Sequence, residues 1–184
     1  MADFKEAMAF LETLEFSSPS DILHKNPKEK DITFYGIYKY AHPSWAGWDK
    51  VQRAIDKVGD LEKASVILSK DSELKELVYK FYKAEFWDVM KLESIKDNIK
   101  ANEMFIFGVN AGHHNAIKAA QKLVGVSIDG IIGEKTIRAI NDYDTLAFDL
   151  GYDRLEVAYY QSLIEKNPSL AINERGWIRR AKAV

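Results

Sequence analysis

The stretch from Ile95 to Gly112, IKDNIKANEMFIFGVNAG, decides the fold class because its uncharged side chains recur with the period of a helix. Intervals of four, three, four and three residues separate Ile95, Ile99, Asn102, Ile106 and Val109. This spacing brings these side chains to one face of an α-helix. Gly112 follows as a natural left-handed stop, so the sequence predicts a strongly apolar helix that ends there.

Helical patterns also fill most of the chain on either side of this stretch. An apolar stripe with charged residues outside it runs through residues 4–14. Asp71 or Ser72 is a good N-cap for a helix that runs on towards Trp87. A shorter helix is predicted at residues 113–126. A long C-terminal helix is predicted to present on one face Leu155, Ala158, Tyr159, Ser162 and Leu163.

Two segments near the N-terminus depart from the helical pattern. Residues 16–30 are rich in Ser, Pro, Asp, Asn and Lys, which indicates an irregular loop. Residues 31–40, DITFYGIYKY, fit either a short hairpin strand or the start of a helix. Connections are short and no linker rich in Pro, Gly or Ser divides the chain. We therefore expect one mainly all-α domain over residues 1–184, with a short β-hairpin or irregular loop after the first helix.

The composition is that of an ordinary globular domain. Of the 184 residues, 47% are hydrophobic and 29% are charged, and the formal net charge of −2 provides no general attraction for nucleic acid. The chain has no cysteine, which excludes disulfides and thiolate metal sites. No apolar run is long enough for a membrane span, and the first residues are acidic and amphipathic. We therefore expect no membrane insertion, no signal peptide and synthesis as a cytoplasmic protein.

The familiar motifs for metals, nucleotides and nucleophilic serines are missing from the sequence. His113 and His114 are adjacent, so they point roughly 100° apart on a helix and cannot face one metal ion together. Gly108 and Gly112 lie at the end of a predicted helix without a following Gly-Lys-Ser/Thr, unlike a phosphate-binding loop. We therefore expect neither a metal nor a cofactor.

A carboxylate at the end of the first predicted helix has the setting that glycoside hydrolysis requires. Such a reaction needs a carboxylic acid to protonate the leaving oxygen, and apolar neighbours favour the protonated form. Glu15 closes the helix beside Phe16 and a polar loop, and Tyr35, Trp45 and Trp87 supply further aromatic rings. From spacing alone, a solvated surface carboxylate is the more usual explanation for a glutamate at the end of an amphipathic helix.

Several segments of the chain match the motifs of one enzyme family. Phe4, Ala7, Met8 and Glu15 follow the register F-x-x-A-h-x-h-h-x-x-x-E, where h is apolar, and Thr33, Gly36 and Ile37 follow T-x-x-G-I. Phe105–Gly112 is similar to F-D-x-A-V-N-x-G, and Asp129–Asn141 is similar to a D-G-x-h-G-x-x-T segment. These motifs resemble those of the glycoside hydrolase family 108 lysozymes, also described as secretion activators or phage-type N-acetylmuramidases.

The resemblance implies a lysozyme-like helical bundle and a function. Residues 1–95 would form the catalytic part, and residues 96–184 a peptidoglycan-binding-like part integrated in the same fold. Glu15 would be the general acid that cleaves β-1,4 bonds in peptidoglycan glycan strands. The substrate-binding residues would be Thr33, Tyr35, Trp87 and Asn110. Without a signal peptide, a holin, a secretion system or lysis would bring the protein to the cell wall or periplasm.

The chain departs from the family at the turn after the catalytic position. The family continues E-G-G-Y, whereas Glu15 is followed by Phe16, Ser17 and Ser18. Glycines let a backbone bend sharply or approach a ligand closely, so their absence bears on the shape of a cleft. Three functions remain open: an active muramidase, a peptidoglycan-binding module without turnover, and a helical interaction protein of phage or secretion machinery. No family position identifies a second carboxylate; the loop offers Asp21, Glu29 and Asp31.

Overall fold

The computed structural model describes residues 1–16, 18–27 and 29–183, and its contacts divide the chain into two compact units. One unit comprises residues 10–83, here called the small unit. The other, the large unit, comprises residues 1–9 and 84–184. Each unit is described by itself. Among the helices described, none combines the length and the apolar character needed to cross a bilayer.

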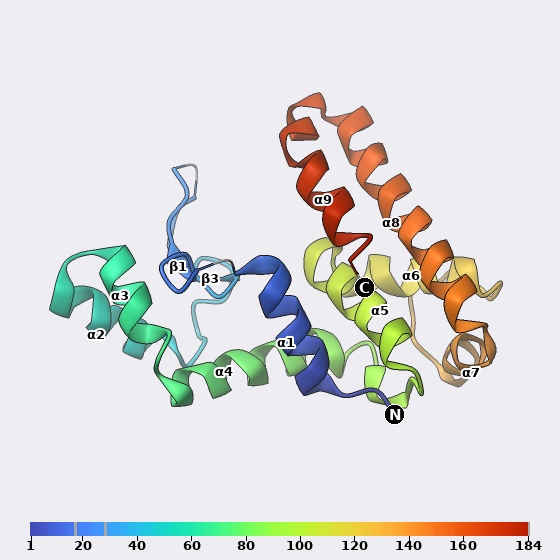
Figure 1. Ribbon diagram of the computed structural model, residues 1–184, viewed down its shortest axis with the longest axis horizontal. Coiled ribbons are helices and arrows are strands. Elements are labelled where there is room, and N and C mark those ends of the chain that lie inside the picture. Colours follow the sequence, from blue (N-terminus) through green and yellow to red (C-terminus); the bar gives the residue numbers. More distant parts are fainter. Residues whose placement is uncertain (17, 28, 184) are drawn as a thin grey trace. The chain divides into compact units, whose positions relative to one another are not determined.

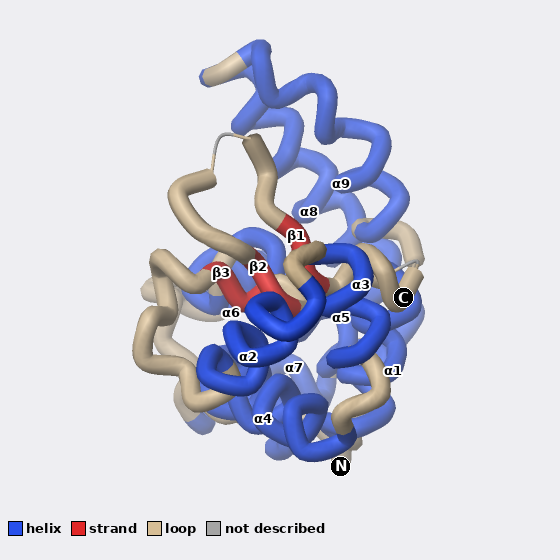
Figure 2. Tube along the Cα trace, turned by 90° about the vertical axis from the view of Figure 1, so that its left-hand side faces the viewer, coloured by secondary structure: helices blue, strands red, loops and turns tan. Residues whose placement is uncertain are grey.

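The small unit combines a three-stranded sheet with helices (Figures 1 and 2). The antiparallel sheet has the order β1 (Leu23–His24), β2 (Thr33–Phe34) and β3 (Ile37–Tyr38). The helices are α1 (Phe4–Glu15), whose first residues belong to the large unit, α2 (Trp48–Val58), α3 (Leu61–Leu68) and α4 (Ser72–Tyr82). A mainly helical fold with a hairpin after the first helix is therefore confirmed.

The stretch of residues 31–40 forms a hairpin, and its turn consists of Tyr35 and Gly36. Their φ angles are both positive, 45° and 75°. Two positive φ angles in a two-residue loop match the right-handed twist of the flanking strands. Glycine adopts such a φ without strain, but tyrosine rarely does. The hydroxyl of the buried Tyr82 in α4 donates a 2.7 Å hydrogen bond to the Tyr35 carbonyl, which stabilises the turn.

The fourth helix begins where the sequence predicts it to begin. The Asp71 side chain accepts a hydrogen bond from the Leu74 backbone N–H and so caps α4. The helix buries one face, through Leu74, Val78 and Tyr82. It continues as a π-helical segment, η1 (Lys83–Trp87).

The large unit is built around one buried helix (Figure 1). After η1 its elements are η2 (Leu92–Ser94), α5 (Asn98–Ala111), α6 (His113–Leu123), α7 (Glu134–Asp142), α8 (Thr145–Lys166), η3 (Pro168–Asn173) and α9 (Glu174–Arg180). Helix α5 packs against α6 and α8, and every residue from 100 to 108 is buried. Ring contacts fill the core, through Phe4, Trp87, Phe105, Phe107, Phe148 and Tyr152.

The central helix α5 differs from its prediction at both ends. It starts at Asn98 rather than Ile95 because the Asp97 side chain accepts hydrogen bonds from the backbone N–H groups of the first turn. Ile99, predicted on the buried face, is 43% exposed. Gly112 does end the helix with a positive φ of 91°, but its ψ of 140° lies outside the left-handed helical region. The same glycine is the N-cap of α6, so the chain must turn immediately into the next helix.

The buried face of α8 is not the face that the sequence pattern singles out. The buried residues of this helix are Phe148, Tyr152, Glu156 and Tyr160. Leu155, Ala158 and Tyr159, from the predicted stripe, are only partly buried or exposed. The true face contains a carboxyl group and two phenols, which a pattern of apolar residues does not count. The predicted stripe instead lines an open pocket that is described below.

Candidate active site

The C-terminal end of α1 presents two carboxyl groups on the small unit. Glu12 and Glu15 are three positions apart, which places them on the same side of the helix. The Glu12 Oε2 atom accepts hydrogen bonds from Lys75 Nζ at 3.0 Å and from the Tyr79 hydroxyl at 3.4 Å. Lys75 and Tyr79 are one turn apart on α4, so this helix holds Glu12 from one side.

A cavity of about 250 Å³ lies beside these groups. In the described part of the chain, its lining includes Glu12 but not Glu15. The aromatic wall consists of Phe16 and Tyr35, whose rings meet edge to face with centroids 4.8 Å apart. The remaining lining residues are Ser18, Pro19, Ile22 and Ser69. The cavity therefore places one carboxylate next to two rings.

Burial and the charges around the cavity shift the pKa values of several neighbouring side chains. Burial raises the pKa of the Tyr35 phenol, and the negative charge of Glu12 raises that pKa further. Tyr79 responds in the same way and for the same two reasons, so its pKa is also raised. Burial alone would lower the pKa of Lys75, but its hydrogen bond and charge interaction with Glu12 outweigh burial and raise that pKa. Of these groups, Glu12 and Tyr35 line the cavity, and Lys75 and Tyr79 form hydrogen bonds to Glu12.

Glu15 is the last residue of α1 and is partly buried. Its charge acts on Tyr82, the tyrosine that supports the hairpin turn. Burial raises the Tyr82 pKa well above its usual value, and the charges of Glu15 and then of Glu12 raise it further. Both carboxyl groups thus act on the same buried phenol. Of the turn after Glu15, Phe16 and Ser18 lie within the described residues and Ser17 lies outside them.

Thr33 and Tyr35, two predicted substrate-binding residues, belong to the same hairpin. Thr33 is 7% exposed, and its hydroxyl donates a 3.4 Å hydrogen bond to Glu29 Oε2. The hydrogen bond from Asn26 lowers the pKa of Glu29, with a smaller contribution from Thr33. The structure therefore places one of the three loop carboxylates, Glu29, next to Thr33.

Trp87 and Asn110 belong to the large unit, where both make internal contacts. Trp87 is 1% exposed, and its ring meets Phe4 and Phe105 at centroid distances of 5.5 and 5.7 Å. Asn110 donates a 3.0 Å hydrogen bond to the Ile106 carbonyl on its own helix. In this structure the first is a core residue and the second is bonded to its own helix. Their predicted contact with substrate stays a prediction.

Sequence reasoning gave no role to Glu12, Lys75 or Tyr79. Glu12 does not fall on the family's catalytic register, and its partners are 63 and 67 residues away in the sequence. The sequence signal that could have indicated these residues lies within each helix separately. Two carboxyl groups lie on one side of α1, and a lysine and a tyrosine lie one turn apart on α4. Only the fold brings the two helices together.

Comparison with known proteins gives two matches to family models that together cover most of the chain. Residues 24–112 match the model described as glycosyl hydrolase 108, and residues 115–182 match a predicted peptidoglycan domain. No sequence among the curated proteins matches the chain. Among solved structures, that of SagA from Brucella abortus has a TM-score of 0.61 and 20% identity. The similarity covers 98% of this chain and 96% of that one, and it concerns the fold.

These comparisons define the class of protein as a lysozyme-like glycoside hydrolase. Residues 24–112 are a glycosyl hydrolase 108 region that is followed by a predicted peptidoglycan domain at residues 115–182, and the resemblance drawn from the sequence is confirmed. The first match begins at residue 24, after α1 has ended. The assignment of Glu15 therefore stays a prediction.

Proposed function

We propose that the protein is an N-acetylmuramidase that cleaves β-1,4 glycosidic bonds in peptidoglycan, with Glu15 as the general acid. The observation that carries the proposal is the match of residues 24–112 to glycosyl hydrolase 108, which follows a helix whose last turn carries two carboxyl groups. A helix end holds a carboxyl rigidly, as a catalytic acid requires. Glycan strands of peptidoglycan are the substrate, and the predicted peptidoglycan domain keeps the enzyme on the wall.

The two carboxyl groups at the end of α1 have different roles in this proposal. Glu12 forms a 3.0 Å ion pair with Lys75 and also accepts a hydrogen bond from the Tyr79 hydroxyl, so both contacts hold its side chain against α4. Glu12 is therefore assigned to holding the cavity wall. Glu15 is assigned to donating the proton that the leaving oxygen needs.

The reaction then follows the general course of glycoside hydrolysis. Glu15 protonates the glycosidic oxygen, the bond to the anomeric carbon breaks, and a water molecule attacks that carbon. Thr33 positions the substrate or this water. Its bond to Glu29 supplies a carboxylate at the same place, which can accept a proton from the attacking water. Tyr35 offers the wall against which a sugar ring packs.

Access to the wall requires a route out of the cell in this proposal. We expect a holin, a secretion system or lysis to release the protein, which then acts at the cell wall or periplasm. Fractionation of producing cells, with and without a co-expressed holin, tests this route. Wall-associated protein in intact cells without either aid contradicts it.

The decisive experiment measures clearing of purified peptidoglycan in a turbidity assay or zymogram. Glu15→Gln removes the acid while keeping the shape of the side chain, and we expect it to abolish clearing. Glu12→Gln removes the partner of Lys75, and we expect weakened but measurable clearing. Glu76→Gln, at an exposed position on α4, is the matched control and keeps full activity. Clearing that survives Glu15→Gln overturns the assignment of the acid.

A second function is favoured by one observation, the narrow cavity beside Glu12. Its volume of about 250 Å³ is below the roughly 300–1,000 Å³ of typical ligand pockets, and Phe16 lines it where the family has glycine. These features suit a module that binds peptidoglycan without turnover. Wild-type protein that sediments with peptidoglycan but never clears it supports the binding module. Neither sedimentation nor clearing supports a helical interaction protein.

A further inference from the structure

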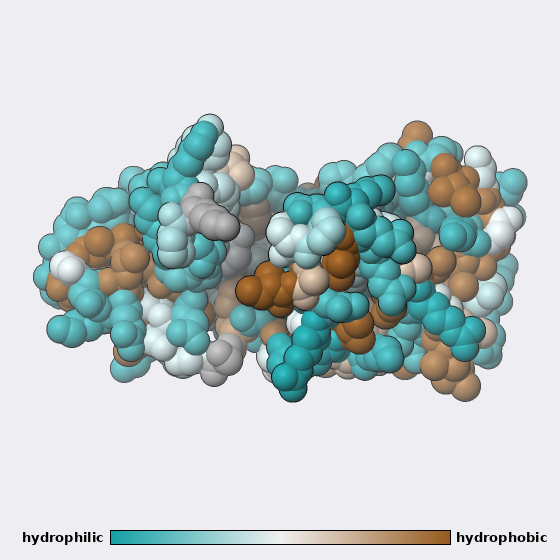
Figure 3. All heavy atoms as spheres, turned by 90° about the horizontal axis from the view of Figure 1, so that it is seen from above, coloured by the Kyte–Doolittle hydropathy of each residue, from teal (hydrophilic) through white to brown (hydrophobic). Residues whose placement is uncertain are grey.

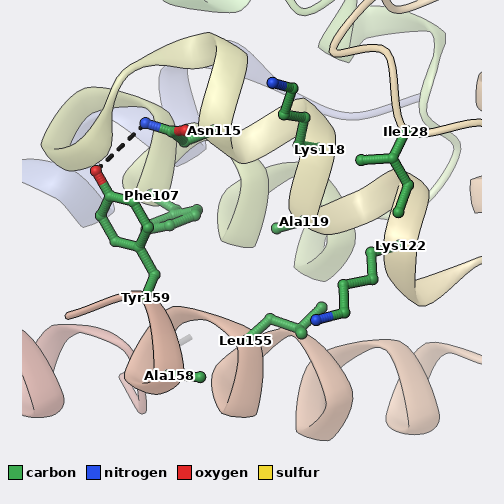
Figure 4. Close-up of a pocket in the computed structure, with 9 residues that line it drawn as sticks. All are labelled: Phe107, Asn115, Lys118, Ala119, Lys122, Ile128, Leu155, Ala158 and Tyr159. Atoms are coloured by element: carbon green, nitrogen blue, oxygen red, sulfur yellow. Dashed lines mark hydrogen bonds between the residues drawn. The ribbon is translucent and has the colours of Figure 1, made fainter. Parts of the chain in front are cut away.

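A second pocket lies within the large unit, between α6 and α8 (Figure 4), and has a volume of about 320 Å³. All but one of its lining residues fall within residues 115–182, the part that matches the predicted peptidoglycan domain. Figure 3 shows separate hydrophobic groups on a mainly hydrophilic face of the molecule. Among the residues that line the pocket, Ile128 is 52% exposed. The pocket therefore offers apolar surface to solvent in the part of the chain expected to meet the wall.

The floor of this pocket is apolar and built of small or branched side chains. Ala119 of α6 lies across from Leu155 and Ala158 of α8, and the buried Phe107 of α5 lies near Tyr159 at one end (Figure 4). Small residues on both helices leave room between them that larger side chains would fill. Methyl groups of a ligand are stabilised where such a floor removes their surface from water.

The rim of the pocket is cationic. Lys118 and Lys122 are four positions apart on α6, so both lie on the side of the helix that borders the pocket. Neither forms an ion pair with any residue that the structure describes. No Asp or Glu is among the described lining residues, although the chain has 28 acidic residues. A ligand with a carboxylate would supply the missing negative charge.

A hydrogen-bonding pair closes one end of the pocket. The Asn115 side-chain amide donates to the Ala111 carbonyl at 2.8 Å and to the Tyr159 hydroxyl at 3.3 Å (Figure 4). These two bonds fix the amide, so its oxygen has a defined direction. The Tyr159 hydroxyl, which accepts the second bond, still has its own hydrogen to donate. The end of the pocket thus presents one acceptor and one donor, as a peptide group requires.

We propose that this pocket binds the stem peptide of peptidoglycan, a short peptide that carries free carboxylates and alanine methyl groups. The lysines pair with a carboxylate, the apolar floor receives methyl groups, and the amide and phenol bond the peptide backbone. A glycan strand stripped of its peptides carries lactyl carboxylates and acetyl methyl groups but no run of successive peptide groups with alanine methyls, so it fits this pocket less well. The inference rests on peptidoglycan being the substrate of the proposed function.

The test uses the full chain and a soluble probe, the pentapeptide L-Ala–γ-D-Glu–L-Lys–D-Ala–D-Ala. Binding is followed by calorimetry or by NMR chemical shifts. We expect Lys118→Glu combined with Lys122→Glu to weaken binding at least tenfold, because attraction becomes repulsion. Lys135→Glu, an exposed lysine on α7 outside the pocket, is the matched charge control and leaves binding unchanged. Circular dichroism confirms that each variant is folded.

Failure of this inference is distinguishable from failure of the proposed function. The Glu15→Gln variant is expected to bind the pentapeptide as the wild type does, and the double lysine variant is expected to keep hydrolysing glycan strands stripped of their peptides. The inference is overturned if the wild type does not bind the pentapeptide, or if the lysine substitutions leave its binding unchanged. Preference for a phosphate-bearing wall polymer over the pentapeptide also overturns it. None of these results depends on whether Glu15 is the acid.

Discussion

Helices α5 and α8 bury a group of carboxyls, and this makes the stability of the protein depend on pH. Glu103 and Glu156 are 1% and 2% exposed, and carboxyl oxygens of Glu103, Asp149 and Asp153 lie within 4.8 Å of one another. Burial, followed by the negative charges of the neighbouring carboxyls, raises the pKa of Glu103 to about 10. Burial and Asp153 raise the pKa of Glu156 to about 9.

The direction of the pH effect follows from where the protons are held. Asp153 also has a raised pKa, about 6, through burial and Asp149, although the positive charge of Lys182 opposes this shift. In the unfolded chain such acids release their protons near pH 4. The folded protein keeps them at higher pH, so the free energy of unfolding is highest below about pH 4 for this group. It falls as the pH rises through the folded pKa values of about 6 to 10.

The magnitude is large compared with the stability of an ordinary domain. Each proton that only the folded state retains lowers the free energy of unfolding by about 1.4 kcal/mol for each unit of rising pH. For one buried glutamate this sets an upper bound on the order of 5 kcal/mol at pH 8, compared with total stabilities of roughly 5–15 kcal/mol. Asp71 acts in the opposite sense, because its cap hydrogen bond lowers its pKa and that stability is lost in acid. We therefore expect greatest stability near pH 5.

The assay is urea unfolding at pH 5, 6, 7 and 8 for the wild type, Glu103→Gln and Glu156→Gln. A chelator is present because carboxylates this close together can bind divalent cations, which would stabilise the folded state. Glutamine resembles the protonated acid, so each variant should gain stability over the wild type at pH 8, on the order of 1–3 kcal/mol. At pH 5 the gain should nearly vanish. A wild type equally stable at pH 5 and pH 8, or a Glu103→Gln variant less stable at pH 8, refutes the reasoning.

Two further predictions concern the hairpin turn, and both are measured by denaturant unfolding. Tyr82→Phe leaves the buried Tyr35 carbonyl without its 2.7 Å bond, so we expect a loss of about 1–3 kcal/mol; an unchanged midpoint contradicts a role for this bond. Gly36 has a positive φ of 75°, and the Cβ that Gly36→Ala introduces would lie only 2.5 Å from the Tyr82 hydroxyl oxygen. Gly125 has a similar φ of 71°, but a Cβ there would meet open space. Gly125→Ala therefore introduces the same backbone strain without the contact. Gly36→Ala should therefore lower the free energy of unfolding more than Gly125→Ala does. Equal losses would show that the structure relieves the contact with Tyr82.

The helices of this protein can be predicted from the sequence where local signals agree with packing. Asp71 caps α4 as expected because a cap is a bond between neighbours in the chain. The sequence patterns leave residues 48–68 without a predicted helix, although α2 and α3 lie there. The signal for α2 is nevertheless present in the sequence, because Trp48, Val51, Ile55 and Val58 recur at helical spacing, and Trp48 and Val51 are buried. In α8 the predicted stripe is not the buried face, because two phenols and a carboxyl group occupy that face together with Phe148.

The candidate site is less predictable, because its contacts join residues far apart in the sequence. The register of the first helix indicates Glu15, but nothing local to α1 shows that Lys75 and Tyr79 hold Glu12. Thr33 is predicted from a motif, whereas its bond to Glu29 depends on how the loop folds back on the hairpin. Packing between helices and loop geometry therefore decide which carboxylate is paired. Sequence spacing identifies the carboxylates themselves.

The hairpin turn and the proposed acid are linked through Tyr82, and this determines how the Glu15→Gln result is read. Tyr82 must keep its proton to donate to the Tyr35 carbonyl, and Tyr35 is part of the cavity wall. Burial is the largest cause of the raised Tyr82 pKa, and Glu15 adds to it. Removing the Glu15 charge therefore leaves Tyr82 protonated and the turn intact. A loss of clearing in Glu15→Gln with unchanged unfolding would then report lost proton transfer to the substrate, not a collapsed wall.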